Sequence, residues 1–254
     1  MNSRRILCET IDSLRATLEQ MARWGCAGFE CPPETVTTTQ GWAAPDLVPQ
    51  SPGAATSTGD GPHRDPRAQG SESLEQIRAD LGDCHRCGLA SGRTHIVFGE
   101  GSARARLVFI GEGPGAEEDR SGRPFVGPAG QLLTKIIQAL KLAREQVYIC
   151  NVIKCRPAGN RDPRPEEITA CRPFLMRQLS TINPEVACTL GTHATQSLLN
   201  STDPVSRLRG RFHTFQHFRV MPTFHPAFLL RHPERKRDVW EDMKKIMALL
   251  RIPL

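Results

Sequence analysis

Side chains suited to binding a planar polar ligand follow several of the strands that the sequence predicts. Asn151 follows one strand and offers both a donor and an acceptor, which is enough to read one edge of a nucleobase. Phe125 stands between Pro124 and a run of small residues, where its ring could stack on a base. His225 follows the last strand. Recognition of a base is one interpretation, and a capping Asn, a core Phe and a structural His are the alternatives.

A glycine-rich loop, Gly111-Glu112-Gly113-Pro114-Gly115, leads into acidic residues that end at Asp119. Glycine lets a backbone approach a ligand closely, because no Cβ intervenes. The Lys-Ser/Thr pair of a phosphate-binding loop does not follow, and the acidic side chains crowd the place where a pyrophosphate would bind. The loop therefore predicts no phosphate cradle, and a plain tight turn is the alternative to a ligand-binding loop.

Cysteines are the second chemical feature, and there are 9 of them. Cys84 and Cys87 have the spacing of metal ligands, and in a reducing compartment such a pair indicates metal or cluster binding rather than a disulfide. Cys150 and Cys188 fall in predicted strands, where we expect buried, inert thiols. Four thiolates suit an iron–sulfur cluster and structural zinc equally well.

Strands alternate with helices from about residue 71 onward, which predicts an α/β fold: a three-layer α/β/α arrangement around a four-stranded, mainly parallel sheet. The predicted strands are 107–110, 147–150, 186–190 and 218–223, and the predicted helices are 74–81, 130–142, 165–181, one ending at 199, and 238–250. Ligands bind beyond the carboxyl ends of such strands. The loops after Ile110, Cys150, Leu190 and Thr223 should therefore meet at one edge.

The first 70 residues differ from this domain in composition and in hydrophobic pattern. Residues 1–31 contain an amphipathic helix, with Leu7, Ile11, Leu14, Leu18 and Met21 on one stripe, which predicts docking on the domain or contact with a protein partner. Residues 32–70 are rich in Pro, Gly, Ser and Thr and predict a flexible linker. Residues 71–254 form the predicted folded domain. No apolar run reaches the roughly 18 residues of a membrane-spanning helix, and no secretory core follows the basic start, so we expect a cytoplasmic protein without a membrane partner.

Charge is distributed unevenly along the chain. The whole sequence has a formal net charge of +6, from 33 basic and 27 acidic residues. Residues 72–254 hold 27 basic and 19 acidic side chains, a balance of +8, while residues 1–71 hold 6 and 8, a balance of −2. A basic domain fits an anionic partner such as nucleic acid, and an ordinary basic surface is the alternative.

Taken in order, the loops resemble the type 4 uracil-DNA glycosylases, the iron–sulfur branch of that superfamily. The resemblance runs from about Cys84 to about Trp240 and does not cover the first 70 residues. The segments that carry it are Gly111-Glu112-Gly113-Pro114-Gly115, Gly122-Arg123-Pro124-Phe125-Val126-Gly127, Asn151-Val152-Ile153-Lys154-Cys155-Arg156-Pro157 and His225-Pro226-Ala227. Each motif alone is modest, but four in order together with the cysteines are highly specific.

The resemblance implies a cofactor and a reaction. It assigns Cys84, Cys87, Cys155 and Cys171 as the ligands of a [4Fe–4S] cluster. The implied activity is hydrolysis of the N-glycosidic bond of deoxyuridine in single- or double-stranded DNA, which releases uracil and leaves an abasic site during base excision repair. Between Cys155 and Cys171 the chain lacks the Lys-Arg-Arg-Ile-His segment of a neighbouring branch that bonds covalently to DNA, so we expect ordinary turnover.

The hypothesis gives individual residues roles. Phe125 stacks on an everted uracil, Asn151 reads its N3–H and O4 edge, and His225 donates to O2 as negative charge develops. The backbone of Glu112 and Gly113 lines the same pocket. Gly113 stands where the best-known branch has a water-orienting Asp, so the carboxylate is left to Glu112, Glu118 or Asp119, with Glu118 or Glu112 preferred.

Contacts with the DNA backbone and base stack complete the hypothesis. Leu229 or Leu230 is expected to wedge into the stack. The candidate phosphate contacts are Lys154, Arg156, Arg161 and Arg231. Two other functions remain open at this point: a non-catalytic DNA-binding or scaffold protein that retains the fold, and a zinc-stapled nucleic-acid hydrolase. The domain is expected to act as a monomer.

Overall fold

The computed structural model describes residues 72–253, which fold around one six-stranded sheet. The strands are β1 (Glu100–Gly101), β2 (Leu107–Gly111), β3 (Tyr148–Asn151), β4 (Val186–Leu190), β5 (His213–Phe215) and β6 (Phe218–Thr223), in the order β1-β3-β2-β4-β6-β5. The four central strands are mutually parallel, and β1 and β5 add antiparallel edges. The parallel core of four strands confirms the predicted fold, and the two edge strands were not predicted.

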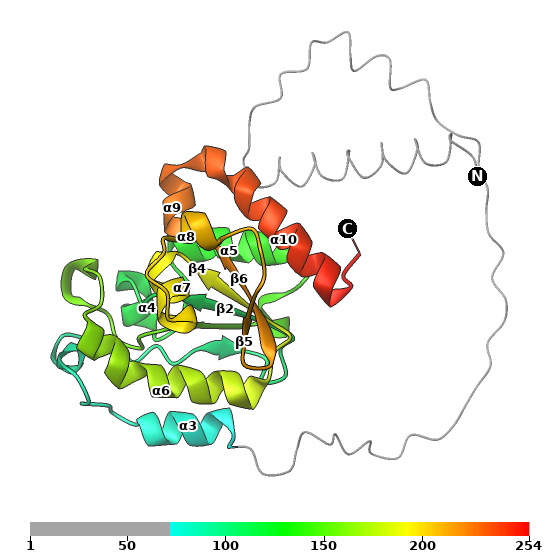
Figure 1. The fold of residues 1–254 in the computed structure, drawn as a ribbon. Helices are drawn as coiled ribbons and strands as arrows, with labels where there is room; N and C mark the ends of the chain where they lie inside the picture. Colours follow the sequence, from blue (N-terminus) through cyan, green and yellow to red (C-terminus); the bar gives the residue numbers. More distant parts are fainter. Residues whose placement is uncertain (1–71, 254) are drawn as a thin grey trace, which may run out of the picture. The chain divides into compact units, whose positions relative to one another are not determined.

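Helices cover both faces of the sheet (Figure 1). The helices are α3 (Leu74–Leu81), α4 (Ala116–Ser121), α5 (Pro128–Ala139), α6 (Pro165–Ile182), α7 (Thr192–Leu199), α8 (Val205–Leu208), α9 (Pro226–Arg231) and α10 (Lys236–Leu250). Short 3-10 turns occupy Gly88–Ser91, Arg144–Gln146, Ala158–Asn160 and Pro233–Arg235. None of the helices within 72–253 is long and apolar enough to cross a membrane.

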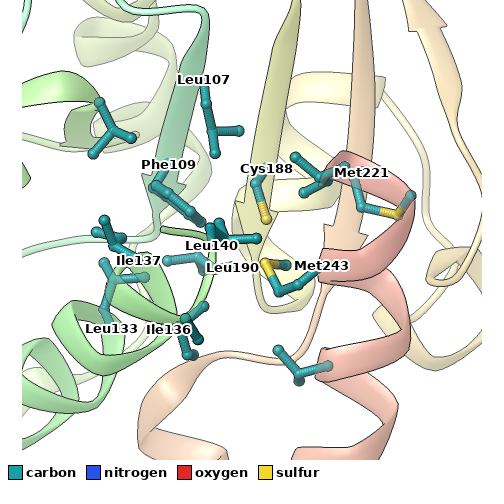
Figure 2. Packing of buried hydrophobic residues seen from close by; sticks show 14 of the residues in the cluster. Leu107, Phe109, Leu133, Ile136, Ile137, Leu140, Cys188, Leu190, Met221 and Met243 are labelled. Carbon is teal, nitrogen blue, oxygen red and sulfur yellow. The ribbon is translucent and has the colours of Figure 1, made fainter. Parts of the chain in front are cut away.

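Two apolar clusters, one on each face, hold the layers together. Along β2, Leu107 and Phe109 face α5 and α10, whereas Val108 and Ile110 face α3 and α6. This alternation follows from the two-residue period of a strand, and because both faces are covered, β2 is apolar throughout. Figure 2 shows the first cluster, where Cys188 and Met221 meet Met243. Cys150 and Cys188 are fully buried thiols, which confirms that prediction.

The parallel topology brings the carboxyl ends of β2, β3, β4 and β6 to one edge of the sheet. Gly111 pairs with Asn151 at the end of β2 and β3, and Leu190 pairs with Thr223 at the end of β4 and β6. The loops that carry the predicted site therefore start from neighbouring positions. The predicted helix in residues 1–31 and the predicted linker in residues 32–70 lie outside the described residues.

Candidate active site

A cavity of about 480 Å³ opens at this edge, a size suited to a small planar molecule. Side chains from all the expected loops except the one after β4 line it. We call Gly111, Phe125, Asn151 and His225 the pocket floor. The cavity is lined by Glu112, Gly113, Pro114, Gly115, Glu118, Phe125, Ala129, Asn151, Pro157, Asn160, Arg161, His225, Ala227, Phe228 and Arg231. The structure thus brings Phe125, Asn151 and His225 into one site.

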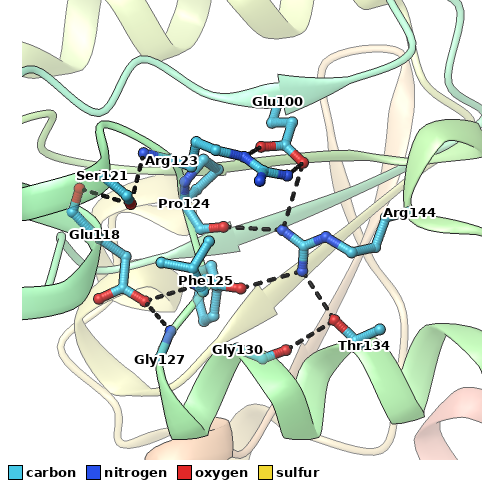
Figure 3. A network of polar contacts seen from close by, with 11 residues as sticks. Glu100, Glu118, Ser121, Arg123, Pro124, Phe125, Gly127, Gly130, Thr134 and Arg144 are labelled. Carbon is cyan, nitrogen blue, oxygen red and sulfur yellow. Dashed lines mark hydrogen bonds and ion pairs between the residues drawn. The ribbon is translucent and has the colours of Figure 1, made fainter.

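Phe125 is held in place through hydrogen bonds to its backbone and to that of its neighbours, not through contacts of its ring. Its φ of 52° is unusual for a residue with a Cβ, so the surroundings must fix it. Arg144 donates to the carbonyl oxygens of Phe125 at 3.2 Å and Pro124 at 2.9 Å (Figure 3). The buried ring lies 5.7 Å from the His225 ring, centre to centre, at 36°. No sequence signal identified Arg144, which lies in a helix-to-strand connection.

Glu118 stabilises the loop that contains Phe125 through hydrogen bonds to its backbone. One carboxylate oxygen of Glu118 accepts the N–H groups of Val126 at 2.9 Å and Gly127 at 3.0 Å, and the other accepts that of Gly115 at 3.1 Å. The carboxylate therefore joins the loop after β2 to the start of α5. With three backbone donors bound, Glu118 acts here as a structural anchor. Asp119 is likewise occupied, because its Oδ1 accepts the N–H of Thr94 at 2.8 Å.

Asn151 presents an unsatisfied polar atom to the floor. Its side chain is 1% exposed, and its Oδ1 accepts no hydrogen bond within residues 72–253. Buried polar atoms are normally paired, so an orphaned acceptor in a cavity marks a place for a ligand donor. A Cβ on Gly111 would come within 2.6 Å of the Phe125 ring and closer still to Asn151 Oδ1. Only glycine lets these two side chains converge over β2.

His225 is fixed in one tautomer. It caps α9, and its Nδ1 accepts the N–H of Ala227 at 3.1 Å. In the neutral ring the proton must then be on Nε2, which is left as a donor. Burial, reinforced by Arg231 and opposed by Glu118, lowers the pKa of His225 to about 4. The imidazole is therefore a neutral hydrogen-bond donor at physiological pH.

Glu112 and Arg231 line the cavity, and together with their neighbours Asp162, His193 and Leu230 they form a group that we call the rim. His193 Nε2 lies 3.5 Å from an Asp162 oxygen and 4.0 Å from a Glu112 oxygen. Burial raises the pKa of Glu112; His193 opposes this shift and Asp162 adds to it. Leu230 is 48% exposed, and Arg231 is exposed. Sequence reasoning missed His193, because its position just inside α7 carries no motif.

Two predicted DNA contacts are wrong. Leu229 is 0% exposed and packs in the apolar cluster with α5 and α10, because α9 turns that face inward. Of the two residues predicted as a wedge, only Leu230 is exposed. Lys154 is also 0% exposed, and its Nζ donates to the Asn151 carbonyl at 2.7 Å and to Gln178 Oε1 at 2.6 Å, so it cannot contact a phosphate.

The remaining predicted cations stay near the surface. Arg161 lines the cavity and makes a two-pronged ion pair with Glu167, at 2.6 Å and 2.9 Å. Arg156 is partly buried and donates to Asn160 Oδ1 at 2.7 Å. Gly113 has its own constraint, because a Cβ there would lie 2.7 Å from Ile153. An Asp at that position would require Ile153 to move.

The four predicted metal ligands gather on the α3–α6 side of the sheet. Cys84, Cys87, Cys155 and Cys171 line a second, shallow cavity, and none of them forms a disulfide. Their sulfurs accept N–H donors: Lys154 N lies 3.3 Å from Cys171 Sγ, and Arg86 lies 3.5 Å from Cys84 Sγ. Hydrogen bonds to sulfur are typical of thiolate ligands in metal centres, so the residues fit such a group.

Comparison with known proteins gives the family. The model of the uracil DNA glycosylase superfamily matches residues 98–244. The chain is 44% identical over 191 residues to a type-4 uracil-DNA glycosylase of Thermotoga maritima, covering 71% of this chain and 96% of that protein. It is 43% identical over 191 residues to the type-4 enzyme of Sulfurisphaera tokodaii, covering 72% and 87%, and 42% identical over 186 residues to that of Archaeoglobus fulgidus, covering 70% and 94%. The chain belongs to the uracil-DNA glycosylase superfamily, in its type-4 branch.

Proposed function

We propose that this protein removes uracil from DNA by hydrolysing the N-glycosidic bond of deoxyuridine, which leaves an abasic site. The observation that carries the proposal is the pocket floor: an aromatic ring, an unsatisfied amide and a neutral imidazole donor meet in one cavity. Uracil inside a duplex is out of reach, so the nucleotide must be everted before its base can enter the cavity.

Recognition of uracil follows from the amide of Asn151. Its orphaned Oδ1 accepts the N3–H of uracil, and its Nδ2 donates to O4. Cytosine has an acceptor at N3 and a donor at N4, so the same amide would face two mismatched groups. The Phe125 ring supplies the stacking surface beneath the base, and the backbone of Glu112 and Gly113 closes the side of the cavity.

Bond cleavage leaves negative charge on the departing uracil, and His225 is placed to stabilise it. Because Nδ1 is occupied by Ala227, the Nε2–H group can donate to uracil O2. The donor is fixed before the reaction begins, which lowers the barrier without reorganisation of the site. The neutral state of His225, caused by its lowered pKa, keeps Nε2–H as a donor rather than a general acid.

A water molecule must then add to C1′ of the sugar while its proton is accepted by a base. Glu112 is our candidate for the carboxylate that positions this water, because it lines the cavity and its pKa is raised by burial. Glu118 is bound to three backbone N–H groups and serves to hold the loop of Phe125 in place. The released uracil anion takes up a proton from solvent.

Binding of DNA is assigned to the rim and its surroundings. Leu230 fills the gap left by the everted nucleotide. Arg156, Arg161 and Arg231 contact phosphates, which positions the protein without reading sequence. The balance of +8 in residues 72–254 supports this assignment. We place the protein in the cytoplasm with its DNA substrate and expect the domain to act as a monomer, with residues 1–31 available to a protein partner.

For the cofactor we propose a [4Fe–4S] cluster on Cys84, Cys87, Cys155 and Cys171. Around a tetrahedral zinc ion with bonds of about 2.3 Å, sulfurs lie about 3.8 Å apart. Among the described residues, the ligand atoms of Glu112, Asp162 and His193 form the only group of three or more within 4.8 Å of one another, so no three of the four sulfurs lie that close together. This spacing favours a multi-iron cluster. A bound cluster would tie the loop before β1, the loop after β3 and α6 together.

The test is excision from uracil-containing oligonucleotides, single- and double-stranded, with alkali cleavage of abasic sites on a denaturing gel. Wild type should cleave both. Asn151→Asp should lose about 10²-fold or more in kcat/KM on uracil, because an ionised carboxylate cannot donate to O4. Asn183→Asp, an exposed residue at the end of α6, is the matched control and should retain wild-type activity. A wild type that leaves uracil in both substrates would refute the proposed function.

A further inference from the structure

Lys154 is a fully buried cation without an acidic partner. Its Nζ donates to the backbone oxygen of Asn151 at 2.7 Å and to Gln178 Oε1 at 2.6 Å. Within residues 72–253 no carboxylate pairs with it, although the side chain is 0% exposed. Placing an ammonium group in the interior is strongly unfavourable unless a nearby negative charge compensates it. A negative group beside Lys154 would favour the charged form of its side chain.

The four cysteines could supply that charge. Lys154 lines the same shallow cavity as all four, and its backbone N–H donates to Cys171 Sγ at 3.3 Å. Cys155 follows it directly in the sequence. Thiols are neutral, whereas thiolates bound to iron or zinc leave the whole centre with net negative charge. A bound metal centre would supply the partner that the protein chain lacks.

A second cation beside the cysteines shows the contrast. Arg93 donates to the Cys84 carbonyl and lies 3.6 Å from Cys155 Sγ, and only 6% of its side chain is exposed. Arg93 also forms an ion pair with Asp83, so its charge is balanced by the protein itself. Lys154 has no such acid. The two cations therefore play different parts at the same site.

Lys154 also reaches the pocket floor. Its Nζ holds the carbonyl of Asn151, the residue whose amide faces the cavity. Gln178, the other acceptor, is itself fixed, because its Nε2 donates to the Phe98 carbonyl and to the Tyr148 hydroxyl, each at 3.0 Å. The position of Nζ is thus set from both α6 and β3. Lys154 thus contacts a predicted ligand through its backbone N–H, and through its side chain it contacts the end of the strand that presents Asn151.

We propose that Lys154 is the buried counter-charge of the metal centre on the four cysteines and a positioning residue for Asn151. The proposal rests on the uracil-excising function and the metal centre proposed above. When the centre is bound, its negative charge holds the Lys154 ammonium in place, and the ammonium holds the Asn151 carbonyl. Integrity of the metal site is thereby coupled to the geometry of base recognition.

The experiment compares three variants of the metal-loaded protein. Lys154→Met removes the charge and both hydrogen bonds, Lys154→Gln removes the charge and keeps a donor, and Gln178→Met keeps the charge within the same buried network. Three quantities are measured: the rate of metal release to a chelator, the reduction potential if the metal is iron, and kcat/KM on uracil-containing DNA. Metal analysis of wild type identifies the centre first.

Both Lys154 variants should release metal about tenfold to a hundredfold faster than wild type, as expected when a charge outside the ligand set is lost. With iron, the reduction potential should fall, because a nearby positive charge favours the reduced cluster. Gln178→Met should release metal within about threefold of the wild-type rate. Lys154→Met should lose kcat/KM about tenfold or more, whereas Lys154→Gln should retain most of it.

Wild-type metal release in both Lys154 variants would overturn the counter-charge, and wild-type kcat/KM in Lys154→Met would overturn the positioning role. If neither Lys154 variant accumulates, Gln178→Met decides: rapid metal loss there would mean that packing of the network, not charge, retains the metal. A wild type that binds metal but leaves uracil in DNA would refute the proposed function while the release rates still test the counter-charge. A wild type that binds no metal would overturn both.

Discussion

The floor and the rim of the pocket are held in different ways. On the floor, hydrogen bonds between side chains and the backbone hold each key residue: Arg144 donates to the Phe125 carbonyl, Lys154 donates to the Asn151 carbonyl, and the Ala227 N–H donates to the His225 ring. On the rim, Glu112, Asp162 and His193 contact one another only at 3.5–4.0 Å, and Leu230 and Arg231 are exposed.

The contrast separates two tasks. Groups that stabilise a transition state act best when they are oriented before the substrate arrives, and backbone hydrogen bonds provide that orientation. Groups that meet a long, flexible polyanion work through charge and surface, and can remain mobile without much loss. We therefore expect changes on the floor to affect kcat strongly, and changes on the rim to affect binding modestly and in a salt-dependent way.

The largest effect should come from His225→Ala. Removing a preorganised donor to the leaving group should lower kcat about 10²–10³-fold with little change in KM. His217→Ala, in the exposed turn before β6, is the matched control and should behave as wild type. A weaker substrate affinity with an unchanged kcat would place His225 in binding rather than in catalysis.

The pH dependence of the same residue gives an independent reading. Because the pKa of His225 is lowered from 6.5 to about 4 in the folded protein, the unfolded chain binds a proton there in that interval and the folded chain does not. Stability contributed by the neutral imidazole is full above pH 6.5 and declines as the pH falls toward 4. Chemical denaturation of His225→Ala should show a weaker decline over this window than wild type.

A smaller loss of kcat/KM is expected from Glu118→Ala. This variant tests whether the hydrogen bonds that hold the Phe125 loop contribute to activity. The change leaves the N–H groups of Gly115, Val126 and Gly127 without their acceptor and loosens the loop of Phe125. Leaving buried donors unpaired costs about 1–3 kcal/mol, or roughly 5–150-fold in kcat/KM. Glu117→Ala breaks only an exposed ion pair with Arg120, so its kcat/KM should stay within about threefold of wild type. Equal behaviour of the two variants would show that the hydrogen bonds of Glu118 do not support the floor.

The sequence predicted the parts of the molecule that depend on periodicity and local motifs. The strands 186–190 and 218–223 have the predicted bounds, because buried parallel strands are continuous apolar runs flanked by turn residues. The edge strands β1 and β5, of two and three residues, are too short to form a pattern. Within the site, motif residues such as Phe125 and Asn151 were identified, whereas Arg144 and His193 act through tertiary contacts that no local signal encodes.

Burial also limited what the sequence could predict about charged and apolar residues near the site. Lys154 looks like a surface cation in a basic loop, yet Gln178 on α6, 24 residues further along, accepts from it in the interior. Leu229 and Leu230 are adjacent and chemically identical, and only the rotation of α9 separates a core residue from an exposed one. Both errors concern the direction of a side chain, which depends on packing between distant segments.

The smallest effect should come from the rim. Arg231→Ala removes an exposed guanidinium at the mouth of the cavity, where it is free to meet a phosphate. If it neutralises one phosphate, the slope of log binding constant against log salt should become shallower by about 0.7–1, with kcat unchanged. Arg104→Ala, an exposed residue before the opposite end of β2, should leave the slope unaltered and controls for net charge. An unchanged slope in Arg231→Ala would exclude the phosphate contact, and a fall in kcat would assign Arg231 to the chemistry of the floor. Comparison of the Arg231→Ala and Arg104→Ala variants thus shows whether Arg231 acts through electrostatic attraction to DNA, as we expect of the rim, or through the fixed hydrogen bonding of the floor.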